Sequence, residues 1–129
     1  HGSTFGGNPL AMRAALEVLA VMQEDNLLDN ALACGAIISN GLSKALAGGD
    51  GVVQIRGRGL MIGIELDRPC AALVDIARQA GLLINVTGEK VVRLLPPLIV
   101  TSSQAQQLVD ILSPLMIQFL TSSPGAKAA

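Results

Sequence analysis

The chain has 129 residues, enough for one domain with a hydrophobic core. Its 9 basic and 10 acidic side chains give a formal net charge of −1, which argues against binding to nucleic acid or to an anionic membrane surface. The apolar runs are short and interrupted by charges, so no membrane span is predicted, and no signal peptide is visible. These features indicate a cytoplasmic globular protein.

The core is expected to be aliphatic. Half of the residues are hydrophobic, but the only aromatic ones are Phe5 and Phe119. Cys34 and Cys70 lie far apart without metal-ligand spacing. We interpret them as reduced thiols, with a disulfide between them as the open alternative, and we predict no metal site.

The first nine residues, His-Gly-Ser-Thr-Phe-Gly-Gly-Asn-Pro, predict a loop that runs into a helix. Asn8 is a favourable N-cap, and Pro9 suits the first helical position. The glycines let the backbone approach a ligand closely, and the hydroxyls of Ser3 and Thr4 precede a helix N-terminus, where anions bind. On local chemistry alone, a simple capped turn is the more economical interpretation.

Two helices are predicted next. Apolar residues recur at three- and four-residue steps from Pro9 to about Glu24. A second helix is predicted from about Leu27 to Leu46, with glycines 48 and 49 ending it. Its expected buried face comprises Leu28, Ala31, Leu32, Gly35, Ile38, Leu42, Ala45 and Leu46.

Two strands follow, Val52–Arg56 and Leu60–Leu66, joined by a turn or bulge at residues 57–59. The second strand is almost continuously apolar until Glu65, so we expect it to be central and buried on both faces. The Arg-Gly-Arg-Gly sequence at 56–59 resembles a phosphate cradle, but a strand connection with solvated or paired arginines is the better interpretation.

The remaining elements are a helix, a hairpin and a final helix. The helix is predicted over Pro69–Ala80, and its expected inward residues are Ala72, Leu73, Ile76, Ala77 and Ala80. Residues 82–86 and 91–95 are predicted strands joined by a hairpin loop at 87–90.

The last helix is predicted to start at Thr101, with Gln104 completing a capping box. Pro114 should kink it. Its expected apolar stripe comprises Leu108, Ile111, Leu112, Leu115 and Phe119. The order of elements predicts an α+β fold, in which helices cover one face of a small, mainly antiparallel sheet.

Arg93 is the second candidate functional residue. Strand alternation places it on one face with Val91 and Leu95, while Val92 and Leu94 occupy the other. Its planar guanidinium matches a carboxylate through two parallel hydrogen bonds. Without further information, a solvated or ion-paired surface arginine is the commoner explanation.

Three parts of the sequence resemble class III pyridoxal-phosphate aminotransferases, the family of acetylornithine, ornithine and 4-aminobutyrate aminotransferases. They are residues 1–11, residues 56–66, and residues 81–87 together with 92–98. The resemblance extends to about Phe119, and residues 81–87 look most like the acetylornithine branch. It implies the C-terminal domain of a fold-type I pyridoxal-phosphate aminotransferase.

The resemblance also implies roles for the two candidate sites. Thr4 matches the family threonine that binds the cofactor phosphate of the neighbouring subunit, with Ser3 as a weaker candidate. Arg93 matches the arginine that binds the substrate α-carboxylate. The family forms homodimers through the N-terminal loop. Residues 1–26 are accordingly expected to be an interface loop and connecting helix, 27–120 the C-terminal α/β domain, and 121–129 a disordered tail.

No catalytic residue is assigned within this chain. The Schiff-base lysine of the family and the aspartate facing the pyridine nitrogen lie before the first motif, and Lys44, Lys90 and Lys127 do not match that lysine. The chain also begins with His1, inside a family motif. We therefore expect a C-terminal portion of a longer protein, inactive alone.

Two functional interpretations follow from the resemblance. The full-length enzyme would use pyridoxal 5'-phosphate to transfer an amino group from N-acetylornithine to 2-oxoglutarate in arginine biosynthesis. Ornithine, 4-aminobutyrate and succinyl-diaminopimelate stay open as alternative donors. The second interpretation is a non-catalytic dimerisation domain, and it is compatible with the first because it concerns only the isolated chain.

Overall fold

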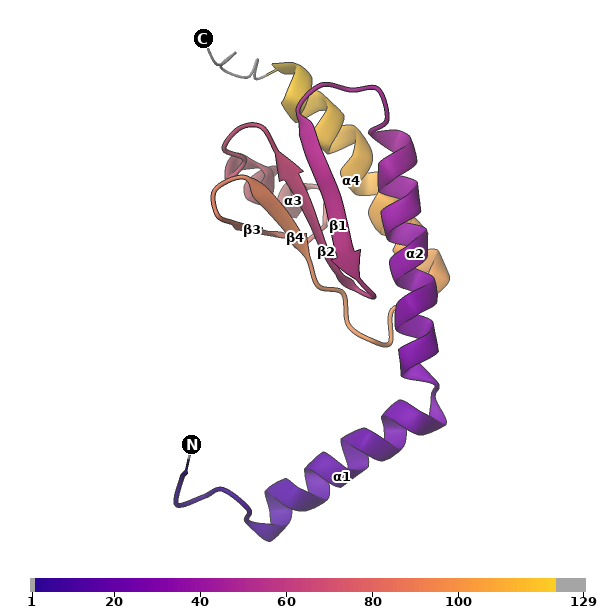
Figure 1. Ribbon diagram of the computed structural model, residues 1–129, viewed down its shortest axis with the longest axis vertical. Coiled ribbons are helices and arrows are strands. Elements are labelled where there is room, and N and C mark those ends of the chain that lie inside the picture. Colours follow the sequence, from indigo (N-terminus) through magenta and orange to yellow (C-terminus); the bar gives the residue numbers. More distant parts are fainter. Residues whose placement is uncertain (1, 123–129) are drawn as a thin grey trace.

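The computed structural model describes residues 2–122, which form helices and a single sheet (Figure 1). The order of elements is the predicted one, which confirms the α+β class. Within this described part, no helix is both long and apolar enough to cross a bilayer. The elements are α1 (Pro9–Glu24), α2 (Leu27–Ala45), β1 (Val52–Arg58), β2 (Met61–Leu66), α3 (Ala72–Gln79), β3 (Asn85–Thr87), β4 (Val91–Leu94) and α4 (Ser102–Ser122).

The sheet has four antiparallel strands in the order β1-β2-β4-β3. Helices α2, α3 and α4 pack against one of its faces, and the other face is left open (Figure 1). The predicted arrangement of helices on one face of a small antiparallel sheet is therefore confirmed. The open face is where strand side chains can meet a ligand.

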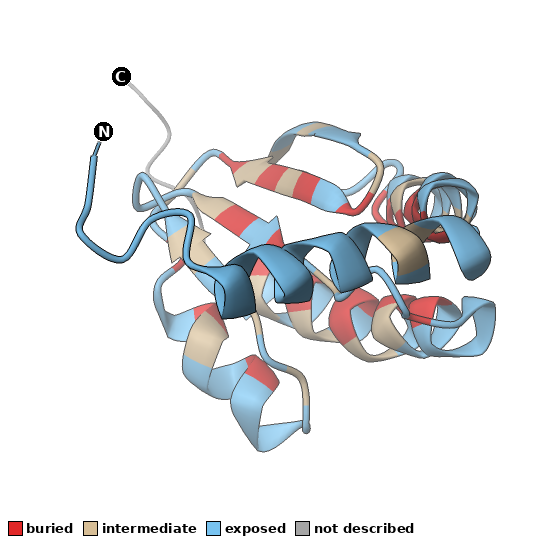
Figure 2. Cartoon of the chain, turned by 90° about the horizontal axis from the view of Figure 1, so that it is seen from below, coloured by how far each residue is buried: buried red, intermediate tan, exposed pale blue. Residues whose placement is uncertain are grey.

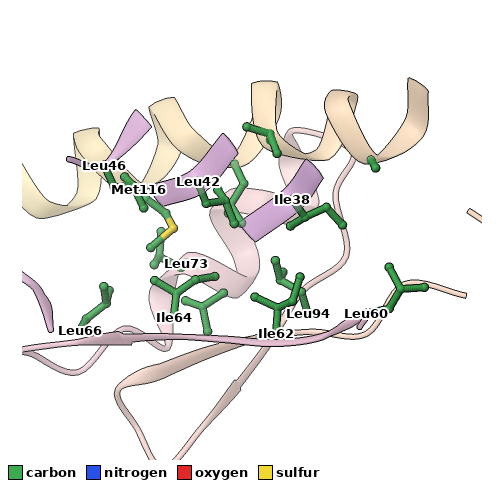
Figure 3. Close-up of a cluster of buried hydrophobic side chains, with 14 of the residues drawn as sticks. Ile38, Leu42, Leu46, Leu60, Ile62, Ile64, Leu66, Leu73, Leu94 and Met116 are labelled. Atoms are coloured by element: carbon green, nitrogen blue, oxygen red, sulfur yellow. The ribbon is translucent and has the colours of Figure 1, made fainter. Parts of the chain in front are cut away.

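The core lies between the sheet and these three helices, and it is aliphatic. On β2, Ile62 and Ile64 point toward the helices, as Figure 3 shows. Leu94 on β4 does the same, and α2 and α4 supply the opposite wall with side chains such as Leu42 and Met116. Since alternate strand residues point to opposite faces, the positions between these core residues face outward.

The prediction that β2 is buried on both faces is wrong, although β2 is a central strand. Met61 is 64% exposed, and Gly63 and Glu65 are only half-buried. The helices form one layer, so a single face of the strand is covered. The continuous apolar pattern arose because Met61 and Gly63 occupy outward positions without carrying a charge.

Strand β1 is longer than predicted. Gly57 and Arg58 continue the strand and pair with Ile62 and Met61, so they do not form a turn. The connection to β2 is reduced to two residues, Gly59 and Leu60. Gly59 has a φ of +56°, and such a left-handed conformation permits a two-residue hairpin turn.

The buried face of α2 differs from the prediction on one side. Leu28 and Leu32 are 65% and 62% exposed, and Ala45 is also exposed. One residue step rotates a side chain by about 100° around a helix, so the neighbours of core residues can face solvent. The buried residues of α2 are Leu27, Ala31, Cys34, Gly35, Ile38 and Leu42.

Helix α3 begins at Ala72, three residues later than predicted. Only Leu73 and Ala77 are buried, whereas Ala72, Ile76 and Ala80 are exposed. The short helix contacts the core through a narrow stripe, one residue per turn.

The predicted strand over residues 82–86 is also wrong in its first half, because β3 contains only Asn85–Thr87. Asn85 pairs with Arg93, so an extension of β3 would place residues 83 and 82 opposite Leu95 and Pro96. Pro96 has no N–H to donate, and β4 ends at Leu94. The segment before Asn85 consequently lacks a strand partner.

Helix α4 begins as predicted. The Thr101 backbone N–H donates to Gln104 Oε1 at 2.9 Å, and the Gln104 N–H donates to Thr101 Oγ1 at 3.2 Å. The helix continues past Pro114, and the kink expected there stays a prediction. The buried stripe of α4 is shifted around the helix from the predicted one. It comprises Ala105, Val109, Leu112, Ser113, Met116 and Leu120.

The C-terminal turn of α4 is held to the end of β2. The Arg68 side chain donates to Asp67 Oδ1 at 2.6 Å and to the Leu120 carbonyl oxygen at 3.1 Å. The hydrogen bond from Arg68 holds the pKa of Asp67 below its usual value. Residues 121 and 122 therefore belong to α4 and not to the predicted disordered tail, and residues 123–129 lie outside the described part.

Helix α2 crosses the β1–β2 hairpin at Gly35, where the two backbones are in close contact. A Cβ on Gly35 would lie 2.6 Å from the carbonyl carbon of Gly59. Although alanine favours a helix by about 1 kcal/mol over glycine, this overlap should dominate. We expect Gly35→Ala to lower the free energy of unfolding by about 1–3 kcal/mol in urea denaturation.

Gly49→Ala is the matched control for this substitution. The nearest atom to a Cβ at Gly49 is the Leu46 carbonyl oxygen at 3.6 Å, an ordinary contact distance. We expect this variant to unfold at nearly the same urea concentration as the wild type. A Gly35→Ala variant as stable as the wild type would contradict the close packing of α2 on the hairpin.

Candidate functional site

The N-terminal loop is exposed and is organised by short-range hydrogen bonds. The Gly6 N–H donates to Ser3 Oγ at 2.8 Å. Asn8 Oδ1 accepts from the Ala11 N–H at 3.0 Å, which confirms Asn8 as the N-cap of α1. Thr4 makes no side-chain hydrogen bond to any other residue in 2–122, so its hydroxyl is available to a ligand, whereas that of Ser3 already has a partner.

Arg93 lies on the open face of the sheet, as strand alternation predicted. It is exposed between Val92 and Leu94, which are both buried in the core. Its cross-strand neighbours are Gly63 on β2 and Asn85 on β3. Within the described part of the chain, its guanidinium has neither a hydrogen bond nor an ion pair.

Arg93 forms part of a cross-strand row on this open face. In successive strands the row contains Arg56, Gly63, Arg93 and Asn85. A shallow hollow of about 360 Å³ lies over the first three of these residues, and Thr87 contributes to the lining. Gly63 forms the floor of the hollow because it has no side chain. A Cβ at this position would come within 3.3 Å of a Val91 methyl group, so a larger residue would crowd the hollow.

The other arginines of the hollow come from β1. Arg56 forms an ion pair with Glu65 of β2 and donates to Gln54 Oε1 at 3.2 Å. Arg58 is exposed and lies two residues further along the same strand face. The preferred interpretation of this segment was a strand connection with solvated or paired arginines, and Arg56 is indeed paired while Arg58 is exposed. The alternative phosphate cradle does not form, because Gly57 and Arg58 are paired in β1.

Gly63 and Glu65 were not singled out as part of a site. The strand pattern placed them on β2, but only the register between β1, β2 and β4 brings them beside Arg56 and Arg93. That register depends on the position of the hairpin turn, which was expected one to two residues earlier. Placing the turn at Gly59 and Leu60 would have predicted the correct register and so the position of Gly63 and Glu65.

Thr4 and Arg93 are not brought together within this chain. The loop that carries Thr4 lies at the end of α1 distant from the sheet (Figure 1). Helix α1 has no buried residue and is largely exposed along its length (Figure 2). Large apolar side chains on it are open to solvent, namely Leu10, Met12, Leu16, Val18, Leu19 and Val21.

Both cysteines are free, buried thiols. The Cys34 Sγ–H donates to the Val100 carbonyl oxygen at 3.3 Å, and burial raises the pKa of the Cys70 thiol. No group of three or more potential His, Cys, Asp or Glu metal ligands gathers among residues 2–122. These thiols serve the packing of the core.

A comparison with known protein families covers both candidate sites, Thr4 and Arg93. The sequence model of the family described as aminotransferase class-III matches residues 1–116. The chain belongs to the class III aminotransferase family. The resemblance noted in the N-terminal string, the 56–66 segment and the β4 region is thereby confirmed.

Curated relatives point to one branch of this family. The chain is 57% identical over 120 residues to acetylornithine aminotransferase 1 of Bordetella pertussis, covering 93% of this chain and 30% of the relative. It is 48% identical over 122 residues to the acetylornithine aminotransferase of Nitrosomonas europaea, covering 95% and 31%. The chain thus spans about 30% of the length of these relatives.

Solved structures show the same fold. An ornithine aminotransferase from Toxoplasma gondii matches with a TM-score of 0.87 and 33% identity, covering 95% of this chain and 30% of that chain. The acetylornithine aminotransferase of Elizabethkingia anophelis matches with a TM-score of 0.82 and 33% identity, covering 92% and 31%. The predicted likeness to aminotransferases is therefore confirmed for the α+β fold.

Proposed function

We propose that the chain is the C-terminal part of a pyridoxal-phosphate-dependent aminotransferase that transfers an amino group from N-acetylornithine to 2-oxoglutarate, in arginine biosynthesis in the cytoplasm. The observation that carries this proposal is the guanidinium of Arg93 on the open sheet face, which has no hydrogen bond or ion pair within residues 2–122 and lies beside the hollow floored by Gly63. The choice of donor is supported by the names of the acetylornithine aminotransferase relatives.

Arg93 is the residue that would bind the substrate. An arginine fork holds a carboxylate through two charge-assisted hydrogen bonds, which fix both its position and its plane. The buried neighbours Val92 and Leu94 anchor the strand on either side, so the guanidinium projects from a rigid support. Fixing the α-carboxylate in this way orients the bond to the Cα hydrogen, and orientation lowers the barrier to the chemical step.

The N-terminal loop fits the phosphate group of the cofactor. Thr4 offers a hydroxyl with no other side-chain partner in residues 2–122, next to glycines that allow close approach. We propose that this hydroxyl donates to the phosphate, with Ser3 as a weaker contact. Pyridoxal phosphate, when bound, withdraws electrons from the substrate Cα. A Toxoplasma gondii ornithine aminotransferase carries this cofactor at partial occupancy in its active site.

We further propose that residues 1–26 serve a subunit interface, whereas residues 27–120 form the C-terminal domain. The distance of the Thr4 loop from the sheet supports this division, because one chain does not bring Thr4 and Arg93 to one site (Figure 1). The exposed apolar side chains of α1 also favour burial against other protein surface. A homodimer in which the loop reaches the partner's phosphate site satisfies both observations.

Ornithine is the second candidate donor. The solved relatives from Toxoplasma gondii and Plasmodium yoelii are ornithine aminotransferases at 33% and 31% identity. The candidate residues in this chain bind a carboxylate, which N-acetylornithine and ornithine share. Turnover of the complete protein with N-acetylornithine, ornithine, 4-aminobutyrate and succinyl-diaminopimelate distinguishes the donors, and the proposal requires the first to be preferred.

Replacement of Arg93 tests the proposed substrate site. In the complete protein, we expect Arg93→Ala to remove about 2–5 kcal/mol of substrate binding, measured from steady-state kinetics with both the donor and 2-oxoglutarate. The exposed Arg78 of α3, which does not line the hollow, is the control, and Arg78→Ala should have a much smaller effect. Because Arg93 is exposed, urea unfolding should change by no more than about 0.5 kcal/mol. Unchanged kinetics for both substrates would contradict the assignment.

The 129-residue chain alone is expected to lack transaminase activity. Neither Lys44 at the end of α2 nor Lys90 in the β3–β4 loop matches the family lysine that bonds the cofactor. The measurement is turnover of N-acetylornithine and 2-oxoglutarate with added pyridoxal phosphate, with the complete protein as positive control. Turnover by the isolated chain would refute this expectation.

A further inference from the structure

We propose that Glu65 is a specificity-determining residue of the hollow, because it holds Arg56 and thereby keeps Arg56 from sharing a carboxylate ligand with Arg93. Glu65 acts through Arg56 and is a positioning residue. The inference rests on the function proposed for Arg93. It adds a reason why Arg56, the neighbour of Arg93 in the cross-strand row, does not share the ligand of Arg93.

The backbone would allow Arg56 to share a ligand with Arg93. Both residues lie in the same cross-strand row, with only Gly63 between them. Adjacent strands are about 4.8 Å apart, so the two Cα atoms are separated by about 10 Å. Since glycine has no side chain, no group on Gly63 blocks a guanidinium from reaching across the row toward a ligand on Arg93.

Glu65 directs Arg56 along the sheet instead. Glu65 pairs with Gln54 and is therefore the diagonal neighbour of Arg56 across the β1–β2 ladder. Its Oε2 atom accepts a hydrogen bond from Arg56 Nη1. The Arg56 and Glu65 side chains are 47% and 36% exposed, so their pair contributes little to folding and can be removed without unfolding the protein.

The charge of the hollow determines which ligands it prefers. With Arg56 neutralised, a dicarboxylate held by Arg93 gains nothing from directing its second carboxylate along the row toward Arg56. With Glu65 removed, the two guanidinium groups of the row can each hold one carboxylate. A dicarboxylate would then lie flat across the strands, in a geometry different from that of a ligand held at one end.

The test compares glutarate, a dicarboxylate, with butyrate, a monocarboxylate, in NMR titrations of the 129-residue chain that follow the arginine Nε–H signals. We expect Glu65→Gln to raise the affinity for glutarate, relative to butyrate, about two- to fivefold, the range that an exposed ion pair spans. The Nε–H signal of Arg56 should shift with glutarate in this variant and stay unshifted in the wild type.

Three variants separate this effect from a general change in charge. Arg56→Gln combined with Glu65→Gln should return the glutarate preference to the wild-type value. Glu89→Gln removes one acidic charge from the exposed β3–β4 loop and should leave the preference unchanged. Glu65→Asp keeps the acidic partner and should stay close to the wild type.

An unchanged preference in Glu65→Gln, or an equal rise in Glu89→Gln or the double variant, would overturn the proposal. The role of Arg93 is tested separately by Arg93→Gln. If glutarate and butyrate bind this variant as they bind the wild type, then the proposed substrate role of Arg93 fails, whatever the result for Glu65.

Discussion

The covering of one sheet face and the exposure of the other is the constraint on which the candidate site depends. Ile62, Ile64, Val92 and Leu94 must face the helices, because they form the centre of the aliphatic core. The period of two along a strand then fixes Gly63 and Arg93 on the opposite face. Slipping the register of β4 by one residue would bury Arg93 and expose two core side chains, so the core itself holds the guanidinium in place.

Glycine at two positions permits the close packing of α2 against the β1–β2 hairpin. Gly35 allows α2 to lie directly against the β1–β2 turn, and Gly59 makes that turn short. The length of the turn sets the β1–β2 register, which places Arg56 opposite Gly63 and diagonal to Glu65. The charge pattern around Arg93 is thus a consequence of backbone packing at the far end of the hairpin.

The sequence predicted the helices and the strand alternation well, because these follow from local periodicity and capping. The exposed face of Arg93, the cap at Asn8 and the Thr101–Gln104 capping box are examples that the structure confirms. The ends of strands and the exposed sides of helices were predicted poorly. The loss of pairing before Asn85 and the outward position of Leu32 depend on which neighbour lies beside them, and local sequence does not contain that information.

The candidate site was predictable only in part for the same reason. Arg93 could be found from alternation, but its contrast with the paired Arg56 requires the cross-strand register. Thr4 could be identified only by resemblance, because its hydroxyl makes no hydrogen bond within residues 2–122. The proposed homodimer would leave such incomplete pieces in each subunit, and the absence of buried residues on α1 fits that proposal.

The most direct test is a crystal structure of the complete protein with pyridoxal phosphate and N-acetylornithine bound. The account predicts a substrate carboxylate held by both arms of the Arg93 guanidinium at about 2.7–2.9 Å. It also predicts Thr4 of the partner subunit at the cofactor phosphate. A substrate carboxylate bound elsewhere, with other protein covering the open sheet face over Arg93, would contradict the account.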